Sequence, residues 1–337
     1  MRSRLPRRPV DGRPGEGGAA LLAVLLLVAI MGAIAAAAFE KLRLSTALAM
    51  NGASLDQARA YAIGVETLLA LRVDDLIAET PEVTTLAGGW NGIVRQIPLP
   101  GEGYAEGAIK DGGNCFNLNS LAEGDDPAAL VARPLGVAQF TGLMRVLGIS
   151  DASAGRIAEA AADWVDADQA PAPRGAEDAA YAAVDPPHRP GNTLFAEVSE
   201  LRAVAGMDAE TYARLRPYLC ALPSTELSPI NVNTLLPDQA PLVAMLAPGA
   251  IGLEAARAAI AQRPAAGWEN QSDFWGTRAL GGIAPSGDAV GQVQLTTHWF
   301  AFDLKVAYKG AELEETALID ARLTPSRVAV RRWGKDD

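Results

Sequence analysis

The chain has few of the side chains on which most metal centres and catalytic sites depend. Its 337 residues include only two histidines and two cysteines, and aromatic residues make up 6%. His188 and His298 stand without companion ligands, and no serine-nucleophile motif, phosphate loop or zinc spacing accompanies them. The paired acidic residues lack a nearby aromatic cluster that could hold a sugar. We therefore expect no enzymatic activity.

Basic residues are scarce outside the N-terminal leader. Residues 1–18 hold five basic and two acidic residues, so the formal net charge of −11 for the whole chain becomes −14 for the remainder. Nucleic-acid binding needs clustered Lys and Arg to contact phosphates. An acidic body therefore predicts no nucleic-acid partner, and it suits an extracytoplasmic domain or one that binds cations.

The most prominent feature of the chain is an uncharged, mostly aliphatic run of 21 residues, Ala19–Phe39. As a helix it would measure about 31 Å, enough to cross a bilayer core of about 30 Å. The arginine-rich leader keeps the N-terminus cytoplasmic, so the rest of the chain should lie on the periplasmic side of the inner membrane. A plain single-span anchor fits the run equally well, whereas the Gly17–Gly18 pair favours a prepilin-type leader that is cut after a glycine.

Periodicity predicts an α+β fold. The N-terminal helix continues through residues 42–76 with apolar residues at helical spacing. Strands are expected at Ile93–Leu99, Tyr104–Asp111, Phe300–Tyr308, Leu313–Arg322 and Arg327–Trp333. Helices are expected at Pro127–Leu147, Ala152–Val165, Val198–Ala205, Ala209–Leu219, Leu242–Leu246, Leu253–Gln262 and Gln271–Trp275. This order predicts a pilin-like long helix and an antiparallel β-sheet, interrupted by a large all-α insertion.

These elements define five expected regions. They are a leader (1–18), a transmembrane helix (19–39), a pilin-like helix with the first strands (40–114), an α-helical insertion domain (115–294) and C-terminal strands that complete the sheet (295–337).

The two cysteines, Cys115 and Cys220, form an even pair. In an oxidising periplasm the simplest expectation is one disulfide between them, and the alternative is two buried thiols. In the chain-entropy model, closing a loop of this length stabilises the fold by about 4–5 kcal/mol.

An acidic loop from Asp163 to Asp178 is the best candidate binding site. Hard cations take six to eight oxygen ligands, and like charges this close repel unless a cation neutralises them. Arg174 is the only basic residue in the loop, and the spacing is not that of an EF-hand. Asp163 and Glu200 are second-line candidates, and the alternative is a solvated acidic loop. The first-choice ligands are Asp166, Asp168, Glu177 and Asp178.

Several segments, in order, resemble the general secretion pathway protein K (GspK) family, the large minor pseudopilins of type II secretion. The resemblance extends from Gly18 to about Trp333. The segments that carry it are Cys115–Leu121, Asp163–Asp168, Gly175–Asp178, Val198–Arg202, Leu219–Pro223 and Ile230–Thr234.

The resemblance implies how the N-terminus is processed. Prepilin peptidase would cut after Gly18 and leave Ala19 as the mature, methylated N-terminus, and cleavage after Gly17 stays open. Ala23 would then stand at the fifth mature position, where most pilins carry Glu and this family does not. Because that Glu is thought to pair with the subunit ahead, its absence and the bulky insertion imply a place at the tip of the pseudopilus.

The resemblance also implies partners and a cofactor. It predicts assembly with minor pseudopilins I and J, and with H, to support protein export, together with contacts of the insertion to the secretin or to secreted proteins. It further implies calcium in the acidic loop and a SAM-like insertion. The alternative is a single-span anchored periplasmic protein whose helix-hairpin-helix-like module, around Gly206 and Ile230–Thr234, binds DNA or protein. Asp208 and the acidic surroundings favour a packing role for that module.

Overall fold

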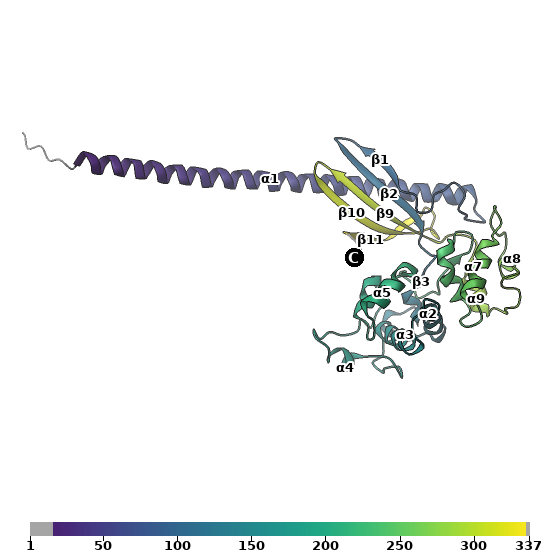
Figure 1. Cartoon of the computed structure of the whole chain (residues 1–337). Helices are drawn as coiled ribbons and strands as arrows, with labels where there is room; N and C mark the ends of the chain where they lie inside the picture. The colour runs from purple at the N-terminus through teal and green to yellow at the C-terminus, as the bar shows by residue number, and fades with distance from the viewer. Residues whose placement is uncertain (1–15, 335–337) are drawn as a thin grey trace, which may run out of the picture. The chain divides into compact units, whose positions relative to one another are not determined.

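The computed structural model describes residues 16–334 (Figure 1). The chain forms two compact units, which meet between Gln57 and Ala58 within the first helix. Residues 1–15, which make up most of the expected leader, lie outside the described residues.

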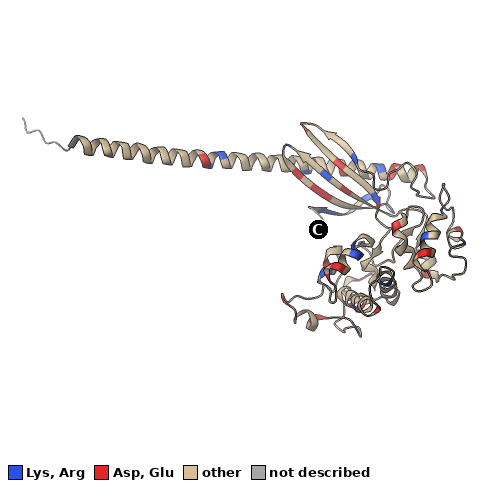
Figure 2. Ribbon diagram, in the orientation of Figure 1, with Lys and Arg blue, Asp and Glu red and all other residues tan. Residues whose placement is uncertain are grey.

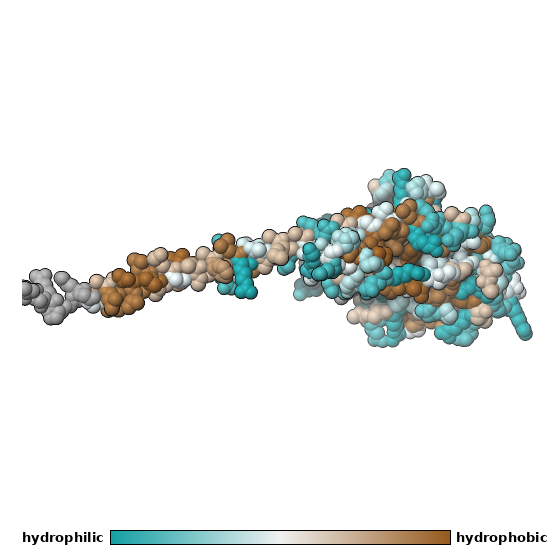
Figure 3. All heavy atoms as spheres, turned by 90° about the horizontal axis from the view of Figure 1, so that it is seen from above, coloured by the Kyte–Doolittle hydropathy of each residue, from teal (hydrophilic) through white to brown (hydrophobic). Residues whose placement is uncertain are grey.

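Helix α1 spans Glu16–Glu79 without interruption. The helix contains no proline, and Pro81 follows two residues after its end, where the ring no longer disturbs helical hydrogen bonds. Residues 17–39 carry no charge, and brown apolar side chains cover this part of the helix (Figures 2 and 3). Among the described residues, α1 is the helix long and apolar enough to cross a membrane.

The second unit begins with the last part of α1, which packs against a five-stranded antiparallel sheet. The strand order is β1-β2-β9-β10-β11, and the strands are β1 (Arg95–Leu99), β2 (Gly103–Asp111), β9 (Trp299–Tyr308), β10 (Ala311–Asp320) and β11 (Arg327–Trp333). One face of the sheet meets α1, where the rings of Tyr61 and Tyr308 lie 5.3 Å apart. The buried alternate residues of β9, Phe300 and Phe302 among them, supply the apolar side of that face.

Between β2 and β9 the chain forms a helical insertion. Its α-helices are α2 (Pro134–Val146), α3 (Asp151–Val165), α4 (Asp178–Tyr181), α5 (Ala209–Leu215), α6 (Ala240–Ala244), α7 (Leu253–Ala261), α8 (Gln271–Trp275) and α9 (Gly287–Gln292). Short 3-10 helices join them at Leu118–Leu121, Pro127–Ala129, Val198–Ala203, Arg216–Tyr218 and Pro237–Gln239. Paired short strands are β3 (Phe116–Asn117) with β6 (Leu219–Cys220), β4 (Ala122–Glu123) with β5 (Val131–Ala132), and β7 (Ile230–Asn231) with β8 (Val293–Gln294).

The insertion has two halves that begin in the same way. Asn117 and Asn231 each end a two-residue strand that pairs in parallel with a later one, and each is followed two residues on by a second asparagine. These asparagines are buried, and their amides bind backbone groups of distant loops, as Asn119 does with Phe195. A buried amide must be satisfied in this way, so each pair fixes the start of its half.

The predicted α+β architecture is confirmed, with one clear error in the insertion. The sequence predicted a single helix over Pro127–Leu147, but a 3-10 turn and strand β5 precede α2, which begins at Pro134. Pro134 lacks an N–H and pushes Arg133 toward extended backbone, so the helix can only start there. The segment predicted as a helix at Val198–Ala205 is a 3-10 helix ending at Ala203.

Candidate cation site and the junction of the insertion

The acidic loop joins the end of α3 to the start of α4. Asp166 caps the C-terminus of α3, where its N–H donates to the carbonyl of Ala162 and its backbone turns extended. The loop ends at Glu177, which lies directly before α4. The loop therefore brings acidic residues from both of its ends together.

Three carboxylates converge at this point. One carboxylate oxygen each from Asp166, Asp168 and Glu177 lies within 4.8 Å of the others. Asp166 is 4% exposed and Glu177 5% exposed, whereas Asp168 faces solvent. Oδ1 of Asp166 and both carboxylate oxygens of Glu177 are buried without a hydrogen-bond partner. Buried carboxylates without donors are costly in their ionised form unless a proton or a cation neutralises them.

The electrostatics of the loop agree with its geometry. Burial, followed by the charges of Asp168 and Asp163, raises the pKa of Asp166 to about 7. Burial and then the neighbouring acids, Asp163 first, raise the pKa of Glu177 to about 7. Both shifts indicate that ionisation of Asp166 and Glu177 is unfavourable when nothing neutralises their charge.

The residues fit calcium. Calcium takes only oxygen ligands, and three carboxylates that bind through one or both oxygens supply three to six of them. The sequence-predicted Asp166, Asp168 and Glu177 come together, whereas Asp178 lies outside this group as the first residue of α4, with its Oδ2 4.0 Å from Nε of Arg189.

The two second-line candidates have other partners. Asp163 accepts hydrogen bonds from the amides of Ala172 and Ala176. Glu200 accepts from the amides of Ala196 and Glu197 at the start of a 3-10 helix. Their oxygens serve the backbone of neighbouring loops.

A disulfide joins Cys115 and Cys220, whose Cα atoms lie 5.7 Å apart. It links the start of the insertion to β6, beside the β3–β6 strand pair. The first half of the insertion is therefore closed covalently at its base.

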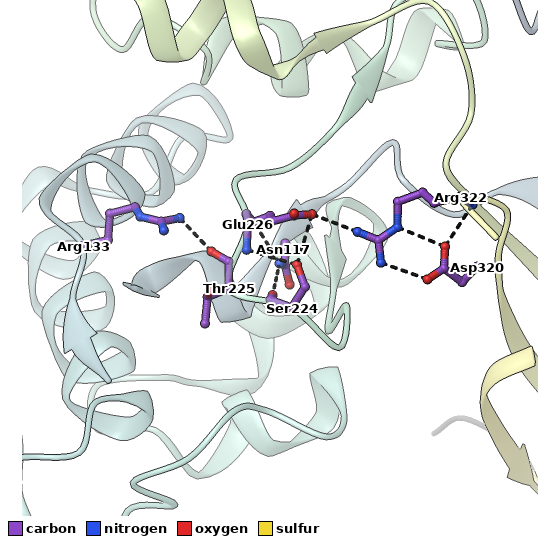
Figure 4. Close-up of polar contacts among 7 residues, drawn as sticks. All are labelled: Asn117, Arg133, Ser224, Thr225, Glu226, Asp320 and Arg322. Atoms are coloured by element: carbon purple, nitrogen blue, oxygen red, sulfur yellow. Dashed lines mark hydrogen bonds and ion pairs between the residues drawn. The ribbon is translucent and has the colours of Figure 1, made fainter. Parts of the chain in front are cut away.

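A polar junction ties the insertion to the sheet (Figure 4). Arg322, in the turn after β10, pairs with Asp320 and reaches Glu226 of the insertion, with its Nη1 3.1 Å from the Glu226 carboxylate. Its guanidinium also lies over the ring of Trp299, 4.5 Å from the centroid. Sequence reasoning missed this junction because no spacing relates Arg322 to a glutamate 96 residues earlier.

Asn117 and Arg133 hold the same insertion loop from its other side. Asn117 donates to the carbonyls of Ser224 and Glu226, and Arg133 donates to that of Thr225 (Figure 4). A cavity of about 830 Å³ lies beside the junction and is lined in part by His298. Burial, followed by the charge of Arg322, lowers the pKa of His298 and so favours its neutral form.

The helix-hairpin-helix-like segment does not present a free helix end to a phosphate. Gly206 has a φ of +85° and makes the turn before α5. Asp208 caps that helix by accepting from the amide of Thr211. A carboxylate thus occupies the place where a phosphate would bind.

Comparisons with known proteins agree with one another. Family models described as type II secretion system protein K match residues 114–224 and 230–298. Type II secretion system protein K of Klebsiella pneumoniae is 38% identical over 325 residues, 95% of this chain and 97% of that protein. The protein of the same name from Pectobacterium carotovorum subsp. carotovorum is 34% identical, over 96% of this chain and 98% of that protein.

The fold is also similar to a solved structure. A chain of the GspK-GspI-GspJ complex from the enterotoxigenic Escherichia coli type 2 secretion system matches with a TM-score of 0.70 and 30% identity. The match covers 83% of this chain and 97% of that chain.

Proposed function

Because the chain belongs to the type II secretion system protein K family, we propose that it is the minor pseudopilin at the tip of the type II secretion pseudopilus. The observation that carries the proposal is the likeness to a chain of a K–I–J complex over most of both lengths. By this likeness, minor pseudopilins I and J bind the chain. Minor pseudopilin H is a further partner in the proposal. Their assembly supports protein export across the outer membrane, and the chain itself catalyses no reaction.

Two features support the tip position. Ala23 replaces the membrane glutamate with which most pilins engage the subunit ahead, so this chain has no charge that demands such a partner. The insertion between β2 and β9 adds bulk to the pilin-like sheet, where it would obstruct another subunit. The insertion would then be the part that faces the secretin or the secreted proteins.

The N-terminal part of α1 would anchor the chain in the inner membrane. Prepilin peptidase would cut after Gly18, and residues 19–39 would span the bilayer with the N-terminus cytoplasmic. The remaining regions, 40–114, 115–294 and 295–337, would lie in the periplasm.

Calcium binding at the acidic loop is part of the proposal. Asp166, Asp168 and Glu177 would hold the ion, with Asp178 as a further candidate ligand. Bound calcium supplies the positive charge that the buried carboxylates lack and ties the end of α3 to the start of α4. These residues bind and orient, and the ion serves a structural role.

A tag at an exposed point of the insertion tests the tip position. Gly282 lies in an exposed turn between α8 and α9, with open space around it, so it tolerates an inserted peptide tag. In a strain that exports normally with the tagged chain, electron microscopy should find the label at one end of each pseudopilus. Label along the length of the pseudopilus, or normal export in a strain that lacks the chain, would refute the proposal.

Calcium titration of the full-length chain in detergent tests the cofactor. We expect calorimetric binding and a higher melting temperature, and Asp166→Asn should weaken binding at least tenfold because it removes a buried ligand charge. Asp151→Asn, an exposed acid at the other end of α3, is the matched control and should leave binding unchanged. Absence of binding in the unsubstituted chain would remove calcium from the account.

A further inference from the structure

A second row of acidic residues on α3 holds the backbone of the acidic loop. Glu159 and Asp163 stand one helical turn apart, so they share a face of the helix. Opposite them runs the loop, whose amides at Ala172, Arg174 and Ala176 all donate to these two carboxylates. These three donors stand around a turn, in which the amide of Gly175 donates to the carbonyl of Ala172, so the turn is held against α3.

Arg174 and Glu159 form the tightest part of this arrangement. Oε2 of Glu159 accepts the Arg174 amide at 2.7 Å, while Oε1 accepts Nε and Nη2 at 3.0 and 2.6 Å. The side chain and the backbone of one residue thus bind both oxygens of one carboxylate. Such a fork fixes orientation as well as position.

Two glycines make room for this contact. A Cβ at Gly155 would lie 2.0 Å from Nη1 of Arg174, so the guanidinium rests on α3 where a side chain is missing. A Cβ at Gly175 would lie 1.9 Å from Oδ2 of Asp163. The loop can approach α3 this closely only because both positions are glycine.

The two rows of carboxylates have separate tasks. The oxygens of Glu159 and Asp163 are engaged by the loop, whereas Oδ1 of Asp166 and both oxygens of Glu177 have no hydrogen-bond donor. Three residues after Arg174, the chain reaches Glu177, which must face Asp166 across the loop for the carboxylates to converge. The row formed by Glu159 and Asp163 therefore sets the path by which the loop leads to Glu177.

We propose that Glu159 and Arg174 are positioning residues of the calcium site, which hold residues 172–176 against α3 so that Glu177 meets Asp166 and Asp168 before the ion arrives. This inference rests on the proposed calcium binding. The Arg174 side chain is half exposed, so its ion pair contributes little to the stability of the whole fold. Its effect is on affinity, because the apparent affinity for calcium falls in proportion as the fraction of molecules whose loop is in place falls.

The experiment is a calcium titration by calorimetry on the full-length chain in detergent, for the unsubstituted protein, three test variants, one double variant and one control variant. Arg174→Met and Glu159→Gln each break the fork, and outer-shell changes of this kind weaken metal binding about 10–100-fold. Gly155→Ala fills the space under Arg174 while it improves the helix propensity of α3. Arg145→Met breaks an ion pair with Asp151 at the other end of the helix and is the control.

We expect at least tenfold weaker calcium binding in the three test variants and no change in the control, with melting temperatures in chelator that stay the same or, for Gly155→Ala, rise. The double variant Glu159→Gln with Arg174→Met should bind calcium about as well as either single variant, because each single variant already removes the same contact. Unchanged affinity in Arg174→Met and Gly155→Ala would overturn the inference and leave calcium binding intact. Absence of binding in the unsubstituted chain would instead overturn the proposed cofactor.

Discussion

At the residue scale, the acidic loop sorts its carboxylates by their partners. Asp163 accepts hydrogen bonds from backbone amides, so groups of the protein itself satisfy its carboxylate. Asp166 and Glu177 are as deeply buried, yet Oδ1 of Asp166 and both oxygens of Glu177 have no donor. Their ionised forms are therefore unfavourable without a cation, so the calcium binding that we propose would be coupled to proton release.

This coupling predicts that calcium binding weakens in acid. The folded pKa of about 7 for both Asp166 and Glu177 lies above the ordinary values of 3.8 and 4.5. Below pH 7 the empty site binds protons that calcium must displace, so affinity should fall steadily from pH 7.5 to pH 5.5. Calorimetry at pH 6.5 in buffers of different ionisation enthalpy should show net proton release. A pH-independent affinity without proton release would contradict this reading.

Another pair of buried carboxylates, outside the acidic loop, lies between α1 and the sheet. Glu315 of β10 is 1% exposed and faces Glu66 of α1, and Arg331 of β11 contacts both. Burial, followed by Glu66, raises the pKa of Glu315 to about 8. Burial also acts to raise the pKa of Glu66, but hydrogen bonds with Arg331 and Glu315 outweigh it and lower that pKa.

Glu315→Gln should therefore stabilise the chain increasingly as pH rises. From about pH 4.5 to pH 8 the unfolded state loses the Glu315 proton while the folded state keeps it, so the unsubstituted protein loses stability over this window. The melting-temperature advantage of the variant, measured in saturating calcium, should grow from pH 5 to pH 9. Glu312→Gln, an exposed residue of the same strand, is the control. A difference that does not change with pH would refute the assignment.

Sequence reasoning picked out three carboxylates that converge in the loop, but not the residues that hold the loop. Asp166 and Asp168 are alternate residues in a Pro- and Gly-flanked loop, a pattern that the sequence alone shows. Glu159 lies inside α3, and it meets Arg174 only because of the direction in which the loop returns. Nothing in the spacing of these two residues fixes that direction.

At the element scale, α1 carries two kinds of surface. Its first part is apolar on every side, while residues 58, 62, 65 and 73 turn small or β-branched side chains to the sheet. The alanines at 33 and 35–38 leave the membrane part of the helix thin, which favours close approach of other helices.

Ala35→Leu or Ala36→Leu should therefore weaken assembly in the membrane. Leucine is larger than alanine, so it holds neighbouring helices apart. It is also no less hydrophobic, so the segment remains equally suited to the membrane. Recovery of pseudopilins I and J with the tagged chain from detergent-solubilised membranes should fall several-fold. Leu26→Ile, which conserves volume, serves as the control. Unchanged recovery would show that these alanines do not form the contact.

The elements predicted correctly from the sequence are those whose ends are marked by residues in or next to the element. The β9–β10 hairpin has alternating apolar residues and a turn at Lys309–Gly310, both with positive φ, as tight hairpins require. The failed prediction at 127–147 mistook an apolar run for one helix, although Pro134 forbids a helix passing through it. The short strands of the insertion could not be predicted because distant contacts alone define them.

At the scale of the whole molecule, arginines of the C-terminal strands connect the sheet to the insertion. Arg322 reaches Glu226, and Arg332 reaches both the carbonyl of Ala196 and the carboxylate of Glu197. These contacts join residues that are 96 and 136 positions apart in the chain, so side-chain contacts as well as the chain itself attach the insertion to the sheet.

Arg322→Met should loosen this attachment without affecting calcium. It keeps an apolar stem near Trp299 but removes the charge that Glu226 and Asp320 share, at a cost of about 1 kcal/mol. We expect a melting temperature a few degrees lower and faster amide exchange in residues 222–229. Arg327→Met, at an exposed position of β11, should change neither. Equal amide exchange in residues 222–229 of both variants would show that the junction does not stabilise the attachment of the insertion.

The most direct test of the account is native mass spectrometry of the chain purified from membranes that also contain minor pseudopilins I and J. The account predicts a complex with one copy of each protein, in which this chain begins at Ala19, and the loss of both the cleavage and the complex when prepilin peptidase is inactive. A chain that keeps its leader in both strains and is recovered without I and J would contradict it.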